Sequence, residues 1–212
     1  MYSDPQEIKD KHKGDIPTLW KIYVSDKPFY KNFYFKISIG FSITLTILSL
    51  MSHISSYTLM IKVINTTLNI LPNLLGFNLG AYILIVGFGG TDILATITKP
   101  LAKQSDYSFY QKLNGVLGIA VIVQIVTLVT SFSLNLWDSI QADLILSIGN
   151  NYFIELVSLF GLFIVVFLVV YSIILLVNVV KHVFMFAQTI HFCIYTENLR
   201  KKNDNENKKQ MN

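Results

Sequence analysis

Long apolar runs separated by short polar stretches dominate this chain of 212 residues. A helix needs about 20 apolar residues to cross the hydrocarbon core of a membrane, which is roughly 30 Å thick. Four segments reach that length, at residues 37–55, 70–91, 113–137 and 156–180. Charged residues are confined to the two ends of the chain and to the stretches between these runs. The pattern therefore predicts an all-α fold with four transmembrane helices.

The first of these segments has an ambiguous pattern. Apolar and polar residues alternate over residues 37–47, which in a soluble protein is typical of a β-strand. A single strand in lipid would leave its backbone N–H and C=O groups without partners. We therefore expect a helix, whose Ser and Thr hydroxyls bond to carbonyls or to a neighbouring helix. In the second segment, we expect Pro72 in the first helical turn and Asn69 as its cap.

The positions of Lys and Arg predict the orientation, because cytoplasmic loops of membrane proteins carry an excess of these residues. If both termini are cytoplasmic, 16 of the 17 cations lie inside and only Lys62 lies outside. The opposite orientation would leave one cation inside. The many Asn and Lys residues suggest an AT-rich coding sequence, as in some bacteria and phages. We expect a multi-pass protein of the bacterial inner membrane with both termini in the cytoplasm.

Two segments extend beyond the predicted spans. The stretch from residue 16 to residue 36 either lies along the cytoplasmic membrane surface or forms a partly ordered tail. Apolar residues continue after the fourth span, and between Glu155 and Glu197 only Lys181 is charged. A helix of that length is roughly twice as long as the hydrocarbon core is thick. It either breaks near Lys181 or projects into the cytoplasm.

The chain is therefore expected to comprise four parts. They are a cytoplasmic or interfacial segment, a four-helix transmembrane domain, a cytoplasmic helical extension and a disordered tail, at residues 1–36, 37–180, 181–199 and 200–212. Lys181, His182 and Gln188 lie on a polar stripe of the extension. These three side chains are candidates for binding a cytoplasmic protein partner.

Two groups of glycines are expected to bring helices close together. Gly76, Gly80 and Gly87 share one face of the second span, and Gly115 and Gly118 lie near the inner end of the third. Glycine lets two helix backbones approach closely in lipid. The face of the second span either packs against another span of the same chain or joins two copies. We expect a homo-oligomer.

Amide and hydroxyl side chains lie within the second and third spans. Asn73 and Asn78 belong to the second, and Gln124 and Thr127 lie near the centre of the third. Polar groups surrounded by lipid need partners, so we expect them to bond across the bundle. In an oligomer the same residues would line a pore.

The sequence contains no motif of a familiar membrane enzyme. It has neither the HExxH motif of metalloproteases nor the GxSxG motif of hydrolases, and no His or Cys pair has metal-ligand spacing on one helix. We expect no catalytic residue, metal or cofactor. The net charge of +4 comes from lysines that flank the apolar runs, so the expected partner is the lipid bilayer and not nucleic acid.

Residues 72–80, Pro-Asn-Leu-Leu-Gly-Phe-Asn-Leu-Gly, form a P-x-L-L-G-F-x-x-G element inside an apolar helix, with Gly87 beyond it. The element resembles a pattern in small bacterial multi-span proteins found beside anti-phage defence genes. The membrane subunit of the Kiwa system and the transmembrane effectors of retrons are proteins of this kind. The resemblance covers one short stretch of the chain. It implies an oligomeric membrane sensor or a membrane-damaging effector and carries over no catalytic residue.

Three functions are compatible with these patterns. The first is a non-enzymatic, self-associating membrane component of a defence system, which senses or disrupts the membrane together with a cytoplasmic partner. The second is a small channel or carrier with a path lined by amides and hydroxyls. The third is an intramembrane enzyme whose catalytic residues converge from different helices.

Overall fold

A computed structural model describes residues 13–25, 28–52, 54–87, 107–144 and 151–210 of the chain. Its elements in chain order are α2 (Ile16–Val24), the short 3-10 helix η1 (Phe29–Lys31), α3 (Phe33–Met51), α4 (Ser56–Gly87), α6 (Phe109–Leu144) and α7 (Asn151–Gln210). The start of the predicted amino-terminal segment and residues 88–91 of the second predicted span lie outside the described residues.

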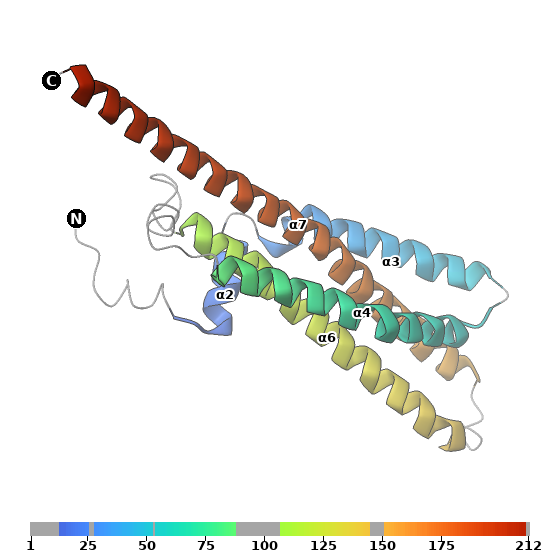
Figure 1. The fold of residues 1–212 in the computed structure, drawn as a ribbon. Coiled ribbons are helices and arrows are strands. Elements are labelled where there is room, and N and C mark those ends of the chain that lie inside the picture. The colour runs from blue at the N-terminus through green and yellow to red at the C-terminus, as the bar shows by residue number, and fades with distance from the viewer. Residues whose placement is uncertain (1–12, 26–27, 53, 88–106, 145–150, 211–212) are drawn as a thin grey trace.

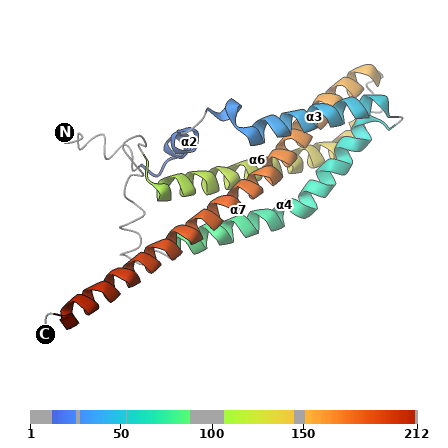
Figure 2. The ribbon, with the colours of Figure 1, turned by 90° about the horizontal axis from the view of Figure 1, so that it is seen from above.

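The four long helices run alternately in opposite directions (Figure 1). Helix α7 is central, because it packs against α3, α4 and α6, while α4 also packs against α6. The end of α3, the start of α4, the end of α6 and the start of α7 lie together at one end of the bundle, and α2 lies at the other (Figures 1 and 2). This arrangement places segments that are far apart in sequence side by side along α7.

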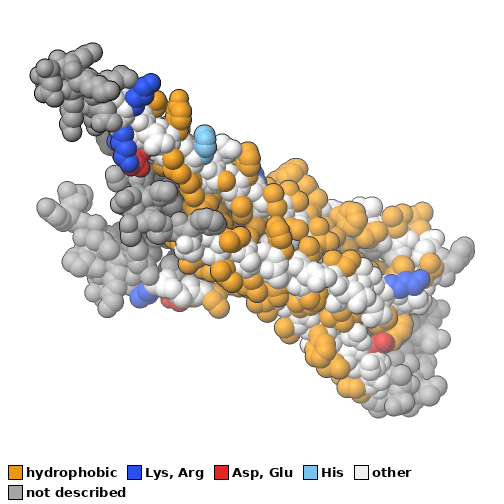
Figure 3. All heavy atoms as spheres, viewed as in Figure 1, with side chains coloured by type: hydrophobic (Ala, Val, Ile, Leu, Met, Phe, Trp, Pro, Cys, Tyr) orange, Lys and Arg blue, Asp and Glu red, His pale blue; other side chains and the backbone are white. Residues whose placement is uncertain are grey.

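Four helices are long and apolar enough to cross a membrane: α3, α4, the stretch Phe109–Ile140 of α6 and the stretch Glu155–Asn203 of α7. Apolar side chains cover the visible surface of the bundle along its length (Figure 3). Inside, buried side chains are polar nearly as often as apolar. A soluble protein has the opposite distribution, with apolar residues concentrated inside. The predicted all-α fold with four such helices is confirmed, and the distribution favours lipid as the surrounding solvent.

Helix α3 forms where the alternating pattern was ambiguous. Ser38, Ser42 and Ser49 fall on one face of this helix and are buried. The Ser38 hydroxyl donates to the Tyr34 carbonyl at 2.9 Å, and the Ser42 hydroxyl donates to the Ser38 carbonyl at 2.7 Å. These bonds satisfy the Ser38 and Ser42 hydroxyls within α3, whereas the Ser49 hydroxyl lies 3.1 Å from that of Ser56 on α4. The small side chains then let α3 pack closely against α7.

The predicted start of the second span is wrong, because α4 begins at Ser56 and Pro72 lies inside the helix. The carboxylate of Glu155 accepts the Ser56 backbone N–H at 3.1 Å, and this bond satisfies an otherwise unpaired donor at the new helix start. Asn69 is therefore not a cap. Proline has no N–H to donate to the carbonyl four residues earlier, which bends a helix. Figure 2 shows α4 bending along its length.

A small apolar groove of about 220 Å³ lies beside this part of α4. Leu71 and Leu74 of α4 and Val169 and Ile173 of α7 contribute to its walls. The helix direction changes near Pro72, so the two halves of α4 meet α7 at different angles.

Helix α7 is unbroken at Lys181 and continues to Gln210. The chain contains no Gly or Pro after Gly161, so nothing in this stretch terminates a helix. Glu197 and Lys201 form an i,i+4 ion pair at 2.6 Å, a spacing that supports helix formation. The segment expected to be disordered from residue 200 is therefore helical through Gln210. The helix has 60 residues and is about 90 Å long.

The amino-terminal segment contains a helix that docks on the bundle. The Asp15 side chain accepts the Thr18 N–H at 2.8 Å and caps α2. Leu19 and Ile22 of α2 lie against α6, where a Cβ added at Gly118 or at Gly115 would come within 2.8 Å of them. Only glycine gives α2 this close approach. The prediction that Gly115 and Gly118 permit close packing is thus explained by α2 and not by another long helix.

We expect the substitution Gly115→Leu to release α2 from α6, because the new side chain would occupy the space of Ile22. Hydrogen–deuterium exchange of the amides of α2 should become faster in this variant. The matched control is Gly76→Leu, since a Cβ at Gly76 meets no atom within 4 Å. Unchanged exchange of the α2 amides in Gly115→Leu would contradict the glycine-dependent docking.

Candidate functional site

A buried pair of amides links α4 to α6 at the middle of the bundle. The Asn78 Nδ2 group donates to Gln124 Oε1 at 2.9 Å. Both side chains are 0% exposed. Gln124 lies at the centre of the stretch Phe109–Ile140, which is as far from water as a side chain of α6 lies in a membrane. A hydrogen bond there has no competition from solvent.

One turn further along α6, a second polar contact joins α6 to α7. The hydroxyls of Thr127 and Ser172 lie 2.8 Å apart. Thr127 also donates to the Val123 carbonyl at 2.7 Å. Ser172 is 0% exposed and Thr127 is 1% exposed. We refer to Asn78, Gln124, Thr127 and Ser172 together as the polar layer, since it joins α4, α6 and α7 at one depth.

The polar layer is incompletely paired. Among the described residues, Asn78 Oδ1 and Gln124 Nε2 are buried atoms without a hydrogen-bond partner, as is the Ser131 hydroxyl one turn beyond Thr127. A buried polar group without a partner costs about 1–3 kcal/mol. The layer therefore holds the helices together by two contacts while keeping one donor and one acceptor of the amide pair unused.

None of the buried polar side chains in the described part of the chain carries a formal charge. Proton relays and ion-coupled transporters use ionisable groups within the membrane. The polar layer contains only amides and hydroxyls, which do not exchange protons at neutral pH. It is suited to hold three helices in register, and to offer polar groups to water or ions if the helices separate.

Two further sets of polar contacts connect elements of the bundle, and the first includes Tyr171, the residue next to Ser172 of the polar layer. Near α2, the Asn32 Nδ2 group donates to the Tyr23 hydroxyl at 3.0 Å, and this hydroxyl lies 3.3 Å from that of Tyr171 on α7. Burial raises the pKa of the Tyr23 phenol above its ordinary value. At the opposite end, the Tyr57 hydroxyl donates to the Asp138 carboxylate.

The structure brings three of the four predicted polar residues into the polar layer and leaves one out. Asn78, Gln124 and Thr127 are buried together, but Asn73 is exposed on α4. Asn73 precedes Asn78 by five residues, a spacing that places the two side chains on different faces of a helix. Because the layer is closed to the surface, these residues do not line an open path in a single copy of the described chain.

The glycines of α4 do not pack against another described helix of the same chain. A Cβ added at Gly76, Gly80 or Gly87 would meet no atom within 4 Å. Of the two interpretations of this face, packing within one chain is therefore not observed. Gly80 instead lines an apolar groove of about 630 Å³ between α4 and α7, with Leu84 and Phe186 among its walls.

The three candidates for partner binding lie on α7, away from the polar layer. Lys181 and Gln188 are exposed, and His182 is half-buried with its Nδ1 atom 2.8 Å from the Asn178 carbonyl oxygen. They do not converge on a common site. In the described ranges, no three His, Cys, Asp or Glu side chains are close enough to hold a metal ion.

Ser172 was not expected to belong to the site, although a signal for it exists. Ser158, Val165, Ser172 and Val179 recur at intervals of seven in the most hydrophobic run, and all four are buried. A repeat of small residues at this spacing marks one face of a helix. It would have identified the face of α7 that meets α6. Tyr23 and Tyr171 gave no such signal, because their contact depends on how α2 docks.

Comparison of the chain with protein-family models, curated proteins and solved structures found no match.

We expect the substitution Asn78→Leu to destabilise the bundle by about 1–2 kcal/mol, because it leaves the whole Gln124 amide without a partner. Unfolding of the purified protein in detergent would measure this loss. The double variant Asn78→Leu/Gln124→Leu should lose less than the sum of the two single variants, since it buries no unpaired amide.

The control for this pair is Asn73→Leu, on the same helix but exposed. It should leave the free energy of unfolding unchanged or slightly increased. If the two single substitutions at Asn78 and Gln124 proved additive, the amide pair would not link α4 to α6.

Proposed function

We propose that this chain is a non-enzymatic protein of the bacterial inner membrane that links the state of its transmembrane bundle to a partner in the cytoplasm. It acts as a membrane sensor or as a membrane-disrupting effector. The observation that carries the proposal is the continuity of α7, which contains Ser172 of the polar layer and runs without a break to Gln210. One rigid element therefore joins the centre of the bundle to a segment far beyond it.

The length of α7 supports a role in transmission. From Ser172 to Phe192 the helix rises by about 30 Å, and Figure 1 shows that α7 projects beyond the neighbouring helices at this end. A partner that tilts or shifts the projecting part moves Ser172 relative to Thr127. The polar layer has two contacts and two unpaired atoms, so such a movement exchanges one set of hydrogen bonds for another. The reverse coupling also holds, since a linked equilibrium is reciprocal.

Charge supports an orientation with both termini in the cytoplasm. Among the cations of the described residues, Lys62 alone lies near the end where α4 begins, while Lys21, Lys36, Lys112 and Arg200 belong to elements at the other end. The excess of positive charge belongs on the cytoplasmic side. The defence setting is supported by the resemblance of residues 72–80.

We expect a reporter enzyme that is active only in the cytoplasm to be active when fused after Asn212, and inactive when inserted near Lys62. Expression of the two fusions in bacteria measures this directly. Activity of the Lys62 fusion together with loss of activity at Asn212 would reverse the orientation.

The effector branch predicts a loss of membrane potential when phage infection triggers the protein. A potential-sensitive dye in bacteria expressing the full chain should report depolarisation soon after infection. A chain that ends at Ile190 should give no response, because it retains the bundle but lacks the projecting part of α7. A normal membrane potential in infected cells that express the full chain would exclude the effector role and leave only the role of a membrane sensor.

A second candidate, a small channel that conducts without a trigger, is favoured by the unpaired atoms Asn78 Oδ1 and Gln124 Nε2. These atoms would bond to water or an ion in an open path. Liposomes containing the purified chain should then conduct, and Asn78→Leu/Gln124→Leu should abolish the flux. Flux that survives this double substitution would exclude a path through the polar layer.

A further inference from the structure

An exposed apolar stripe begins on α7 at Met185 and continues into its projecting part. Phe192 is 65% exposed, Tyr195 is 56%, Leu199 is 43% and Met185 is 42%. With the exposed Gln188, they follow the alternating three- and four-residue spacing 185, 188, 192, 195, 199. This spacing forms the contact seam of a coiled coil. We refer to these five residues as the α7 seam.

The α7 seam lies on the side of the helix opposite the bundle. Val183, Phe186 and Ile190 of α7 line the groove shared with α4, and at 100° per residue they lie about half a turn away from the seam. Another helix can therefore cover the seam without displacing α4 or α6.

The residues beside the seam are uncharged. In a coiled coil whose seam positions are 185, 188, 192, 195 and 199, the flanking positions are occupied by Thr189, His191, Thr196 and Asn198. The Thr189 hydroxyl donates to the Met185 carbonyl and the Thr196 hydroxyl donates to the Phe192 carbonyl, each at 2.9 Å. These hydroxyls are already satisfied within α7. The flanks neither repel an identical helix nor favour a charged one.

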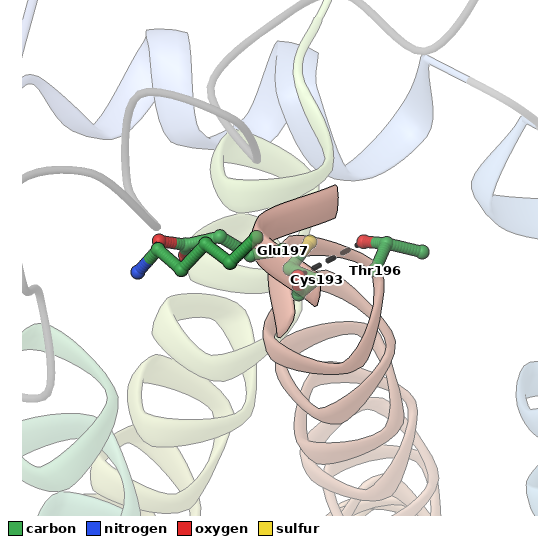
Figure 4. Close-up of polar contacts among 4 residues, drawn as sticks. Cys193, Thr196 and Glu197 are labelled. Carbon is green, nitrogen blue, oxygen red and sulfur yellow. Dashed lines mark hydrogen bonds and ion pairs between the residues drawn. The ribbon is translucent and has the colours of Figure 1, made fainter. Parts of the chain in front are cut away.

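Three charged residues of this part of α7 lie on its back, whereas Lys181 and Lys202 occupy the positions that precede and follow the seam and bound its apolar stretch. Glu197, Arg200 and Lys201 occupy outer coiled-coil positions, and Glu197 pairs with Lys201 within the helix at 2.6 Å. Figure 4 shows Thr196 and Glu197 leaving α7 on different sides. A seam with charged flanks selects a partner of opposite charge. A seam with neutral flanks and an outward-facing ion pair suits a second, identical helix.

We propose that the α7 seam binds the α7 seam of a second copy of this chain as a parallel coiled coil. The membrane supports the parallel arrangement, because two copies inserted in one orientation project α7 from the same face. Gln188 of each copy then meets its equivalent, and two facing amides hydrogen-bond to each other. A polar pair at one seam position fixes the register of a coiled coil. This proposal rests on the proposed membrane insertion and adds self-association to the proposed function.

Disulfide cross-linking of single cysteines in native membranes tests the seam. The chain has one cysteine, Cys193, so Cys193→Ser provides a background without thiols. In this background, Tyr195→Cys should form covalent dimers under a mild copper-phenanthroline oxidant, because equivalent seam positions in a parallel coiled coil lie within disulfide reach. Gln188→Cys should behave in the same way.

The matched controls are Glu197→Cys and Arg200→Cys, on the back of the same turns. We expect at least tenfold less dimer from them than from Tyr195→Cys. A soluble maleimide applied to opened membranes establishes that all four thiols react. Equal dimer yields on both sides of α7, no dimer from either seam variant, or a product with another protein in place of the dimer would each overturn the proposal.

The outcome is separable from the proposed function. Depolarisation that requires residues 191–212, without cross-linking at the seam, would keep the link to a cytoplasmic partner and remove the coiled coil. A strong seam cross-link with no response to any trigger would keep the coiled coil and remove the proposed function.

Discussion

The hydrogen bond between Asn78 and Gln124 is the interaction on which the arrangement of this bundle depends. Lipid surrounds apolar side chains as favourably as a protein interior does, so burial of apolar surface supplies little force between transmembrane helices. Specific contacts then decide which faces meet. The amide pair joins α4 to α6, and the Thr127–Ser172 contact joins α6 to α7. Together they fix the rotation of three helices at one depth, and the exposed surface is left to lipid.

The sequence predicts which segments form long helices better than it predicts where those helices begin. The four long helices were predictable because their apolar runs are longer than a soluble core requires. The alternating segment was predictable as a helix, now α3, because a single strand in lipid would leave its backbone groups without partners. Helix boundaries were less predictable. Residues 56–69 contain Lys62 and two asparagines and lie between the first two predicted spans, but they are helical, and Ile64 and Thr67 are buried against the bundle. Tertiary packing outweighed local polarity there.

The candidate site, like the helices, could be predicted only in part from the sequence. Asn78, Gln124 and Thr127 were predictable as bonded groups, since polar side chains within a span need partners. Asn73 was grouped with them, although its five-residue spacing from Asn78 places the two side chains on different faces of a helix. Likewise, the sequence marks five glycines without indicating their neighbours. Gly115 and Gly118 accommodate α2, whereas Gly76, Gly80 and Gly87 meet no described part of the chain. A motif of small residues predicts that something approaches closely, and the fold decides what.

Helix α7 has one face that is buried in the bundle and an opposite face that is exposed beyond it. Toward the bundle, α7 presents Ser172, Leu175 and Val179, all 0% exposed. Further along, its opposite face presents Phe192 and Tyr195, both more than half exposed. Because one helix carries both faces, any contact that forms on the projecting seam constrains the rotation of the same helix at the polar layer, some 30 Å away. Two copies joined at the seam would hold both Ser172 side chains in one defined rotation. Association outside the bundle and order within it are therefore coupled by the rigidity of a single helix.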